Sequence, residues 1–171
     1  MKNRYNIALI PTAKSEAVVR FAKTFSAFSD RYQLGLQSLP HVTLCQFAAE
    51  ESELLSLWRE VSRKIKPKTV RLHFNEISGT RSSRAFWVSL LPDKAETLTK
   101  MHYAIADIIR HPLNHSYENY FPHMSLINSQ DEKVMDAIKK AEMAYAPIED
   151  DFILSLGRSD KVGQYIEVIY T

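Results

Sequence analysis

The 171-residue sequence has little of what disulfide frameworks, flexible linkers and membrane spans require. Its one cysteine, Cys45, excludes an internal disulfide and is typical of a reducing compartment. Four glycines and seven prolines argue against long linkers or disorder, so we expect one domain over residues 1–171. No apolar run approaches the roughly 18 residues of a membrane span, and the run in MKNRYNIALIP is too short for a signal peptide. The expected protein is cytoplasmic and has no membrane partner.

The charge of the chain is also small. The 22 basic and 20 acidic residues give a formal net charge of +2 at pH 7. This balance permits a basic patch that binds a phosphate group, but it does not suggest a protein that coats long nucleic acid. Nothing in the sequence specifies a second subunit, so a monomer is the default expectation.

The chain instead contains one short phrase twice. LPHVTLCQF occupies residues 39–47 and FPHMSLINS occupies residues 121–129. Each copy has proline before histidine, a hydroxyl residue two positions after the histidine and leucine one position later, and the copies are offset by 82 residues. Composition alone predicts about 0.003 such phrases in a chain of this length. Two copies therefore indicate two related halves.

The order of expected strands and helices also repeats. Alternating apolar residues predict strands, and apolar residues three and four apart predict helices. Each half then reads β-α-β-α-β, with the phrase on the middle strand and a further strand after the second half. Asp93 with Glu96 and Ser129 with Glu132 resemble capping boxes that open two of the helices. The prediction is an α+β fold of two pseudo-symmetric lobes, roughly residues 1–80 and 81–171. The expected elements are strands at 5–10, 41–47, 69–77, 84–91, 123–128, 152–156 and 165–170 and helices at 15–30, 54–65, 93–108 and 129–145.

Strand geometry predicts what each phrase presents. Successive side chains point to opposite faces, so His41 and Thr43 share one face, and His123 and Ser125 share the corresponding face. If a two-fold axis relates the halves, the two middle strands bring two histidines and two hydroxyls to one central cavity. Strict alternation also places Cys45 on the His41 face, where we interpret it as a buried filler and not a nucleophile.

These four side chains limit the chemistry. No acidic residue repeats with the histidines and hydroxyls are poor zinc ligands, so we expect no metal and no cofactor. A serine nucleophile would need its own base and carboxylate, and it would not explain the duplication. Two opposed histidines suit displacement at a phosphodiester, because a neutral imidazole can accept a proton while a protonated one donates. The hydroxyls can then hold the non-bridging phosphate oxygens.

The paired H-x-[ST]-hydrophobic phrases, each in a β-α-β-α-β half, resemble those of the 2H phosphoesterase superfamily, in its 2′-5′ RNA ligase-like and cyclic phosphodiesterase branch. The resemblance covers essentially the whole chain, including the closing LSLGRSDKVGQYIEV. It implies a bilobal α+β fold with a central cleft and metal-independent catalysis. It also implies that His41 and His123 are catalytic and that Thr43 and Ser125 bind phosphate.

Further substrate contacts follow from position alone. Phe47 falls on the His41 face at the end of its strand and Tyr120 precedes the second phrase, so either could stack on a base. Arg81 and Arg84 lie in the segment that joins the halves and could meet a second phosphate. Arg158 and Tyr165 fall in the closing segment that resembles the family and are candidate cleft residues.

Other residues receive structural interpretations. Phe121 and Trp87 are interpreted as packing residues. The four histidines without a matched partner are interpreted as surface or helix-packing residues: His73, His102, His111 and His115.

Three functions are compatible with this site. The main hypothesis is a phosphodiesterase that hydrolyses 2′,3′-cyclic phosphates of nucleotides or RNA ends. The same site could instead join RNA or cleave 2′-5′ linkages. A nucleotide- or RNA-binding module without catalysis is the third reading, although binding alone requires neither histidine to titrate.

Overall fold

The computed structural model describes residues 2–13, 16–82, 85–109, 112–113 and 119–171. Strands and helices alternate in both halves, so the predicted α+β class and element order are confirmed. Two short 3₁₀ turns occur, at Ser26–Phe28 and Glu51–Glu53. The other elements are β1 Asn3–Pro11, α1 Glu16–Lys23, β2 Val42–Ala49, α2 Leu54–Lys64, β3 Thr69–Arg81, β4 Phe86–Pro92, α3 Ala95–Ile109, β5 Met124–Ser129, α4 Val134–Glu142, β6 Ile148–Ser159 and β7 Tyr165–Tyr170.

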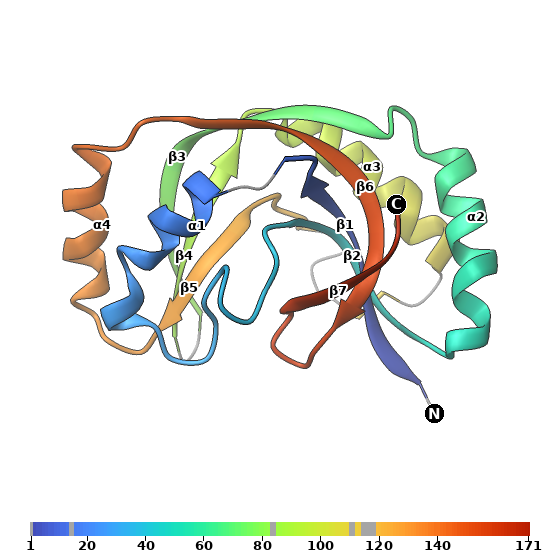
Figure 1. Ribbon diagram of the computed structural model, residues 1–171, viewed down its shortest axis with the longest axis horizontal. Helices are drawn as coiled ribbons and strands as arrows, with labels where there is room; N and C mark the ends of the chain where they lie inside the picture. Colours follow the sequence, from blue (N-terminus) through green and yellow to red (C-terminus); the bar gives the residue numbers. More distant parts are fainter. Residues whose placement is uncertain (1, 14–15, 83–84, 110–111, 114–118) are drawn as a thin grey trace.

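The strands form one antiparallel sheet that interleaves the two halves of the sequence. Its order is β2-β1-β6-β3-β4-β5, and β7 pairs with β6. The strand that ends the first half, β3, pairs with β4, while the long strand β6 returns to pair with β1. Figure 1 shows β3 and β6 side by side across the top of the molecule, where they join its two sides. The phrase strands β2 and β5 are therefore the two ends of the sheet path.

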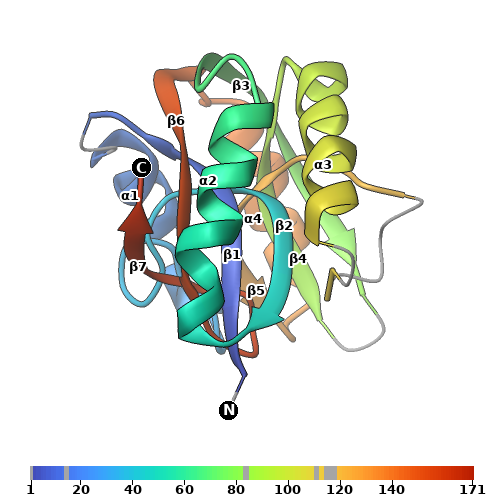
Figure 2. The ribbon, with the colours of Figure 1, turned by 90° about the vertical axis from the view of Figure 1, so that its right-hand side faces the viewer.

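The helices lie in two pairs on opposite sides of the molecule. In Figure 1, α1 and α4 lie on the side of β4 and β5, and α2 and α3 lie on the side of β1 and β2. Figure 2 views the second pair from outside, with α3 beside α2. The apolar stripes predicted for these helices are buried, among them Trp58 and Val61 of α2 and Leu98 and Ile105 of α3. Burial of these stripes supplies the apolar area that stabilises the fold.

Both phrase strands contain a β-bulge at the same position. In the first half, Thr43 pairs with Ala8 and Cys45 pairs with Ile7, so Leu44 is the extra residue. In the second half, the register also shifts within β5, between Ser125 and Ile127. The extra residue there is Leu126, which lies 82 positions after Leu44. A bulge reverses the facing of every later residue in its strand, so strict alternation fails after residue 44.

Each phrase strand is covered on its outer edge by a segment from the other half of the sequence. Along β5, the Leu34 amide donates to the Leu126 carbonyl at 2.8 Å. The Asn128 side-chain oxygen accepts from the Tyr32 amide at 2.7 Å. Along β2, the Leu113 amide donates to the Gln46 carbonyl at 2.6 Å. These contacts satisfy edge groups that would otherwise lack partners, and they hold the two halves together.

Three local predictions are wrong. The Asp93–Glu96 pair is not a capping box, because the Asp93 carboxylate accepts from the His73 amide at 3.1 Å. The first helix ends at Lys23, and its expected continuation to residue 30 is partly a 3₁₀ turn. The Ser129–Glu132 pair is not a capping box, because α4 begins at Val134. The Ser129 hydroxyl instead accepts from the Asp131 amide at 3.1 Å in the turn before the helix. Ser and Asp side chains bond nearby backbone amides in turns as readily as at helix starts.

Candidate active site

The two phrases meet at one cleft of about 330 Å³. His41 and Thr43 line it from the β2 side, and His123 and Ser125 line it from the β5 side. The structure therefore brings together the four residues that the repeat singled out. The remaining lining residues are Tyr32, Gln46, Thr80, Trp87, Tyr120, Phe121, Val162 and Gly163.

The two imidazoles are held by the same local hydrogen bond. Nδ1 of His41 lies 2.7 Å from the Leu39 carbonyl oxygen, and Nδ1 of His123 lies 2.8 Å from the Phe121 carbonyl oxygen. A carbonyl can only accept, so each Nδ1 carries the hydrogen and donates it. Each Nε2 is consequently the nitrogen that exchanges a proton: it is a base when the ring is neutral and an acid when the ring is protonated.

The proline of each phrase lies between the histidine and the carbonyl that it binds. Pro40 separates His41 from Leu39, and Pro122 separates His123 from Phe121. Proline fixes its own φ and favours an extended residue before it. The repeated Pro-His pair thus has a local purpose, because it sets the direction of the carbonyl that fixes the ring.

The two histidines differ in burial. The His41 side chain is 5% exposed, and its ring stacks on Tyr165 with centroids 5.2 Å apart. Burial lowers the pKa of His41 to about 4, although its bond to Leu39 opposes this change, and the neighbouring His123 lowers the pKa further. This ring is neutral at physiological pH and suited to accept a proton.

His123 is exposed to solvent, although protein atoms of the cleft walls surround its ring. Desolvation by these atoms lowers the pKa of His123 from its ordinary value, and the bond to the Phe121 carbonyl opposes the change. Because water reaches this ring, charging it costs less than charging His41. The two imidazoles are therefore equivalent in their hydrogen bonds and unequal in their surroundings.

The bulge decides which side chain follows Thr43 into the cleft. Gln46 lines the cleft, whereas Cys45 and Phe47 are buried in the core. The Phe47 ring contacts Tyr5 with centroids 5.9 Å apart. The prediction that Phe47 contacts substrate is therefore wrong, because the extra residue Leu44 reverses its facing. The interpretation of Cys45 as a buried filler is confirmed, and burial raises its pKa to about 12.

Tyr120 reaches the cleft, but one face of its ring is already occupied. The ring stacks on His102 with centroids 4.1 Å apart, and its hydroxyl donates to the Thr43 carbonyl at 2.7 Å. The Nδ1 of His102 lies 2.6 Å from the Leu44 carbonyl oxygen. Tyr120 and the buried His102 therefore satisfy two consecutive carbonyls at the bulge. The surroundings of Tyr120 indicate that it supports the strand that carries Thr43.

Three aromatic residues that the sequence did not assign to the site line the cleft. Phe121 is 54% exposed, so its interpretation as a core residue is wrong. Its ring lies 6.4 Å from that of His123, centroid to centroid. Trp87 also lines the cleft, and Tyr32 contacts it with centroids 5.5 Å apart. The position of Phe121 before the Pro-His pair does not by itself predict this placement, since Leu39 at the matching position of the first phrase does not line the cleft.

The other predicted substrate residues lie elsewhere. Arg81 is exposed, its guanidinium lies 5.5 Å from the Phe86 ring centroid, and it forms a long ion pair with Glu132. Arg158 pairs with Glu167 at 3.7 Å, outside the residues that line the cleft. Tyr165 is fully buried beneath His41, so the structure makes it a support for that ring and not a substrate contact. Arg84 lies outside the described residues.

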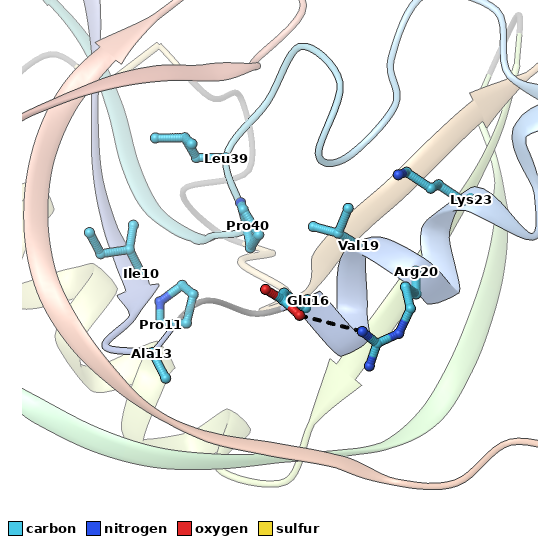
Figure 3. Close-up of a pocket in the computed structure, with 9 residues that line it drawn as sticks. All are labelled: Ile10, Pro11, Ala13, Glu16, Val19, Arg20, Lys23, Leu39 and Pro40. Atoms are coloured by element: carbon cyan, nitrogen blue, oxygen red, sulfur yellow. Dashed lines mark ion pairs between the residues drawn. The ribbon is translucent and has the colours of Figure 1, made fainter.

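A larger cavity of about 500 Å³ lies beside Leu39 and Pro40. Figure 3 shows its apolar wall, including Ile10 and Val19, with the ion-paired Glu16 and Arg20 of α1 on one side. No histidine or hydroxyl side chain is among its described lining residues. The smaller cleft, which holds both phrases, is therefore the candidate active site.

The 2′-5′ RNA ligase superfamily model matches residues 11–153 of this chain. The chain belongs to the 2′-5′ RNA ligase superfamily. A search of curated protein sequences found no match. Membership in this superfamily supports a phosphodiesterase- or ligase-type function, and it confirms the resemblance drawn from the repeated phrases.

Solved structures with the same fold include three of Escherichia coli LigT. The complex with 3′-AMP is 16% identical, with a TM-score of 0.62, and the match covers 100% of this chain and 95% of that chain. The phosphate complex is 16% identical, with a TM-score of 0.57 and coverage of 99% and 93%. The NADP⁺ complex is 13% identical, with a TM-score of 0.55 and coverage of 100% and 95%. These likenesses show that this superfamily member has the LigT fold.

Among the described residues, no group of three or more His, Cys, Asp or Glu side chains could hold a metal ion. No helix within the described ranges is long and apolar enough to cross a bilayer.

Proposed function

We propose that this protein is a metal-independent phosphodiesterase that hydrolyses 2′,3′-cyclic phosphates of nucleotides or RNA ends. The observation that carries the proposal is the pair of histidines that line one cleft from two strands, each with Nδ1 fixed and a hydroxyl residue two positions away. Such a pair provides a base and an acid for in-line displacement at phosphorus. The nucleotide and phosphate complexes of LigT support a substrate of this class.

The burial of the two rings assigns their roles in this proposal. Neutral His41 accepts a proton at Nε2 from the attacking water, whose oxygen forms the new bond to phosphorus. Protonated His123 gives its Nε2 proton to the ribose oxygen whose bond to phosphorus breaks. Thr43 and Ser125 donate hydrogen bonds to the non-bridging oxygens. The product is a phosphomonoester with a free neighbouring hydroxyl, and both histidines exchange their protons with water before the next cycle.

The name of the superfamily favours a second candidate for the same site. Ligation would use a ribose hydroxyl in place of water as the nucleophile, and cleavage of a 2′-5′ linkage would use water on an acyclic diester. A non-catalytic binding module is the third alternative.

The substrate would be a nucleotide or RNA, and we propose a cytoplasmic monomer, which agrees with the single buried cysteine.

The first test is hydrolysis of 2′,3′-cyclic AMP in the presence of EDTA. We expect the purified protein to form an AMP monoester at a rate that EDTA does not change, because the proposed acid and base are both side chains. Product formation is followed by chromatography, with a 2′-5′ linked diadenylate and an RNA with 2′,3′-cyclic phosphate and 5′-hydroxyl ends as parallel substrates. Loss of activity in EDTA and its recovery with zinc would contradict the mechanism. Turnover of the diadenylate alone would favour the second candidate.

The pH profile of kcat/KM is the second test. His41 must be neutral to act as the base, so activity falls on the acid side near its pKa of about 4. His123 must be protonated to act as the acid, and its pKa is lowered from 6.5. The loss of activity with rising pH should therefore begin below pH 6.5. We expect a bell with its maximum between these limits. A maximum above pH 8 would contradict the assignment.

A further inference from the structure

Asn6 of β1 lies fully buried beside the cleft and contacts one of its hydroxyl residues. Its side-chain Nδ2 donates to Oγ1 of Thr43 at 3.0 Å. The bond joins the phrase strand β2 to its neighbour β1, on the side where Thr43 lines the cleft. Asn6 itself is not among the cleft-lining residues, so any effect on substrate passes through Thr43.

This bond limits what the Thr43 hydroxyl can do. A hydroxyl has one hydrogen to donate and two lone pairs to accept. Because Oγ1 accepts from Asn6, its own hydrogen remains available for a group in the cleft. None of the described cleft-lining residues is Lys or Arg. A phosphoryl group bound there depends on such hydroxyl donors and on the histidines, so their orientation before binding is valuable.

The amide is retained at a cost. Oδ1 of Asn6 is buried and has no hydrogen-bond partner among the described residues. A buried acceptor of this kind carries a desolvation penalty, which an apolar residue at the same position would avoid. If the amide were turned over, Thr43 would donate to Oδ1 and lose its hydrogen for the cleft. A costly buried amide beside a site hydroxyl indicates a role in the site.

The second half lacks this arrangement. Asn6 pairs with Gln46 and Trp87 pairs with Asn128, at matching places relative to the two bulges. Trp87 thus occupies the position in β4 that Asn6 occupies in β1. An indole has one N–H donor and no amide group, so Ser125 has no counterpart of Asn6 at that position. The two site hydroxyls are inequivalent.

We propose that Asn6 is a positioning residue that holds the Thr43 hydroxyl as a hydrogen-bond donor to a phosphoryl oxygen. The inference rests on the proposed function, because it concerns how the same cleft binds the phosphate of its substrate.

A double-mutant cycle tests this role. The variants are Asn6→Ala, Thr43→Val and the double variant, with Ser125→Ala and its double variant with Asn6→Ala as the matched control. The readouts are kcat/KM for 2′,3′-cyclic AMP and the Kd of 2′-AMP by calorimetry. We expect Thr43→Val to lower kcat/KM by about 10-fold or more. Asn6→Ala should lower kcat/KM several-fold in the wild-type background and less than 2-fold in the T43V background. In the S125A background it should lower kcat/KM by the same factor as in wild type.

An isosteric change distinguishes orientation from packing. The new carboxylate of Asn6→Asp can only accept a hydrogen bond from Thr43, so we expect kcat/KM to fall further than in Asn6→Ala. In the T43V background only the charge of the new carboxylate acts, so the fall in kcat/KM should be smaller. Equal losses from Asn6→Ala in the wild-type and T43V backgrounds would overturn the inference. If no variant, including wild type, hydrolyses the cyclic nucleotide, the proposed function fails. The same cycle measured on 2′-AMP affinity would then still decide the role of Asn6, since additive losses overturn it and coupled losses support it.

Discussion

Asparagine in place of either His41 or His123 is expected to lower kcat/KM for 2′,3′-cyclic AMP by at least about 10²-fold. Asparagine suits this test because its Nδ2 can still donate to the carbonyl that now accepts from the histidine Nδ1. The local turn is kept, and only the nitrogen that exchanges the proton is lost. The measurement is initial-rate hydrolysis by each variant, with circular dichroism to show that the fold persists.

The matched control is His73→Asn. Nδ1 of His73 of β3 lies 3.2 Å from a carboxylate oxygen of Glu149 on the surface, and His73 does not line the cleft. Its replacement should leave kcat/KM within about 2-fold of wild type, as expected for a surface change.

The shape of the pH profile then separates the two roles. The residual activity of His41→Asn should lose the acid limb, and that of His123→Asn should lose the alkaline limb. Unchanged turnover in both variants would eliminate the two-histidine mechanism. If His41→Asn instead lost the alkaline limb and His123→Asn the acid limb, the roles of base and acid would be exchanged and the site itself would stand.

The repeated phrase correctly predicted which four side chains meet in one cleft, because it carried several independent restrictions. A Pro-His pair, a hydroxyl two residues later and matched neighbouring elements together specified a strand, a face and a partner strand. His41 and His123 do line one cleft with Thr43 and Ser125. The α+β class and the element order followed from periodicity in the same way, since long apolar stripes are strong signals.

The wrong facing predicted for Phe47 in β2 has one cause. Strict alternation does not hold through either phrase strand, because the adjacent apolar pairs Leu44–Cys45 and Leu126–Ile127 break a two-residue period. All four of these side chains are buried. In a strand without a bulge, adjacent side chains point to opposite faces, so two adjacent residues could not both face the same core. The position of Gln46 in the cleft and of Phe47 in the core could have been found from that break.

Other features depend on contacts between distant segments. Nothing near Tyr165 in the sequence indicates that its ring lies under His41, because pairing with β6 and hydrogen bonds to the distant Ser38 and Leu39 place it there. The same holds for Asn6, whose contact with Thr43 crosses from β1 to β2. Arg81 is a candidate for its charge and Arg158 for its place in the closing segment, yet they pair with Glu132 and Glu167, which the sequence does not indicate as their partners.

The support beneath His41 leads to the second large effect, at Gly157 of β6. A Cβ built on this glycine would overlap the Glu167 carbonyl oxygen and the phenol end of Tyr165. The Tyr165 hydroxyl donates to Ser155 at 2.9 Å, which holds the same end of the ring in place. Since backbone and ring must both shift, we expect Gly157→Ala to destabilise the protein by about 3 kcal/mol. That change corresponds to a fall in Tm of about 10 °C for a chain of this size, measured by thermal unfolding.

Gly79 of β3 provides the matched glycine. A Cβ there would lie 2.7 Å from the terminal Cδ1 of Ile138 and 2.9 Å from Sδ of Met135, which are the ends of flexible side chains. These ends can rotate away, so we expect Gly79→Ala to cost about 1 kcal/mol or less. Equal falls in Tm for the two variants would show that Gly157 is not specially confined.

Gly157→Ala should also affect catalysis at temperatures where the variant remains folded. Displacement of the Tyr165 ring removes the stacked neighbour that buries His41, so the pKa of His41 should rise toward its ordinary value and the acid limb of kcat/KM should move to higher pH. Tyr165→Phe keeps the ring and loses only the hydroxyl, so its acid limb should stay near that of wild type. A Gly157→Ala profile that coincides with wild type would show that His41 owes its low pKa to other neighbours. A shift in Gly157→Ala alone would link β6, β7 and the buried imidazole in one support for the proposed base.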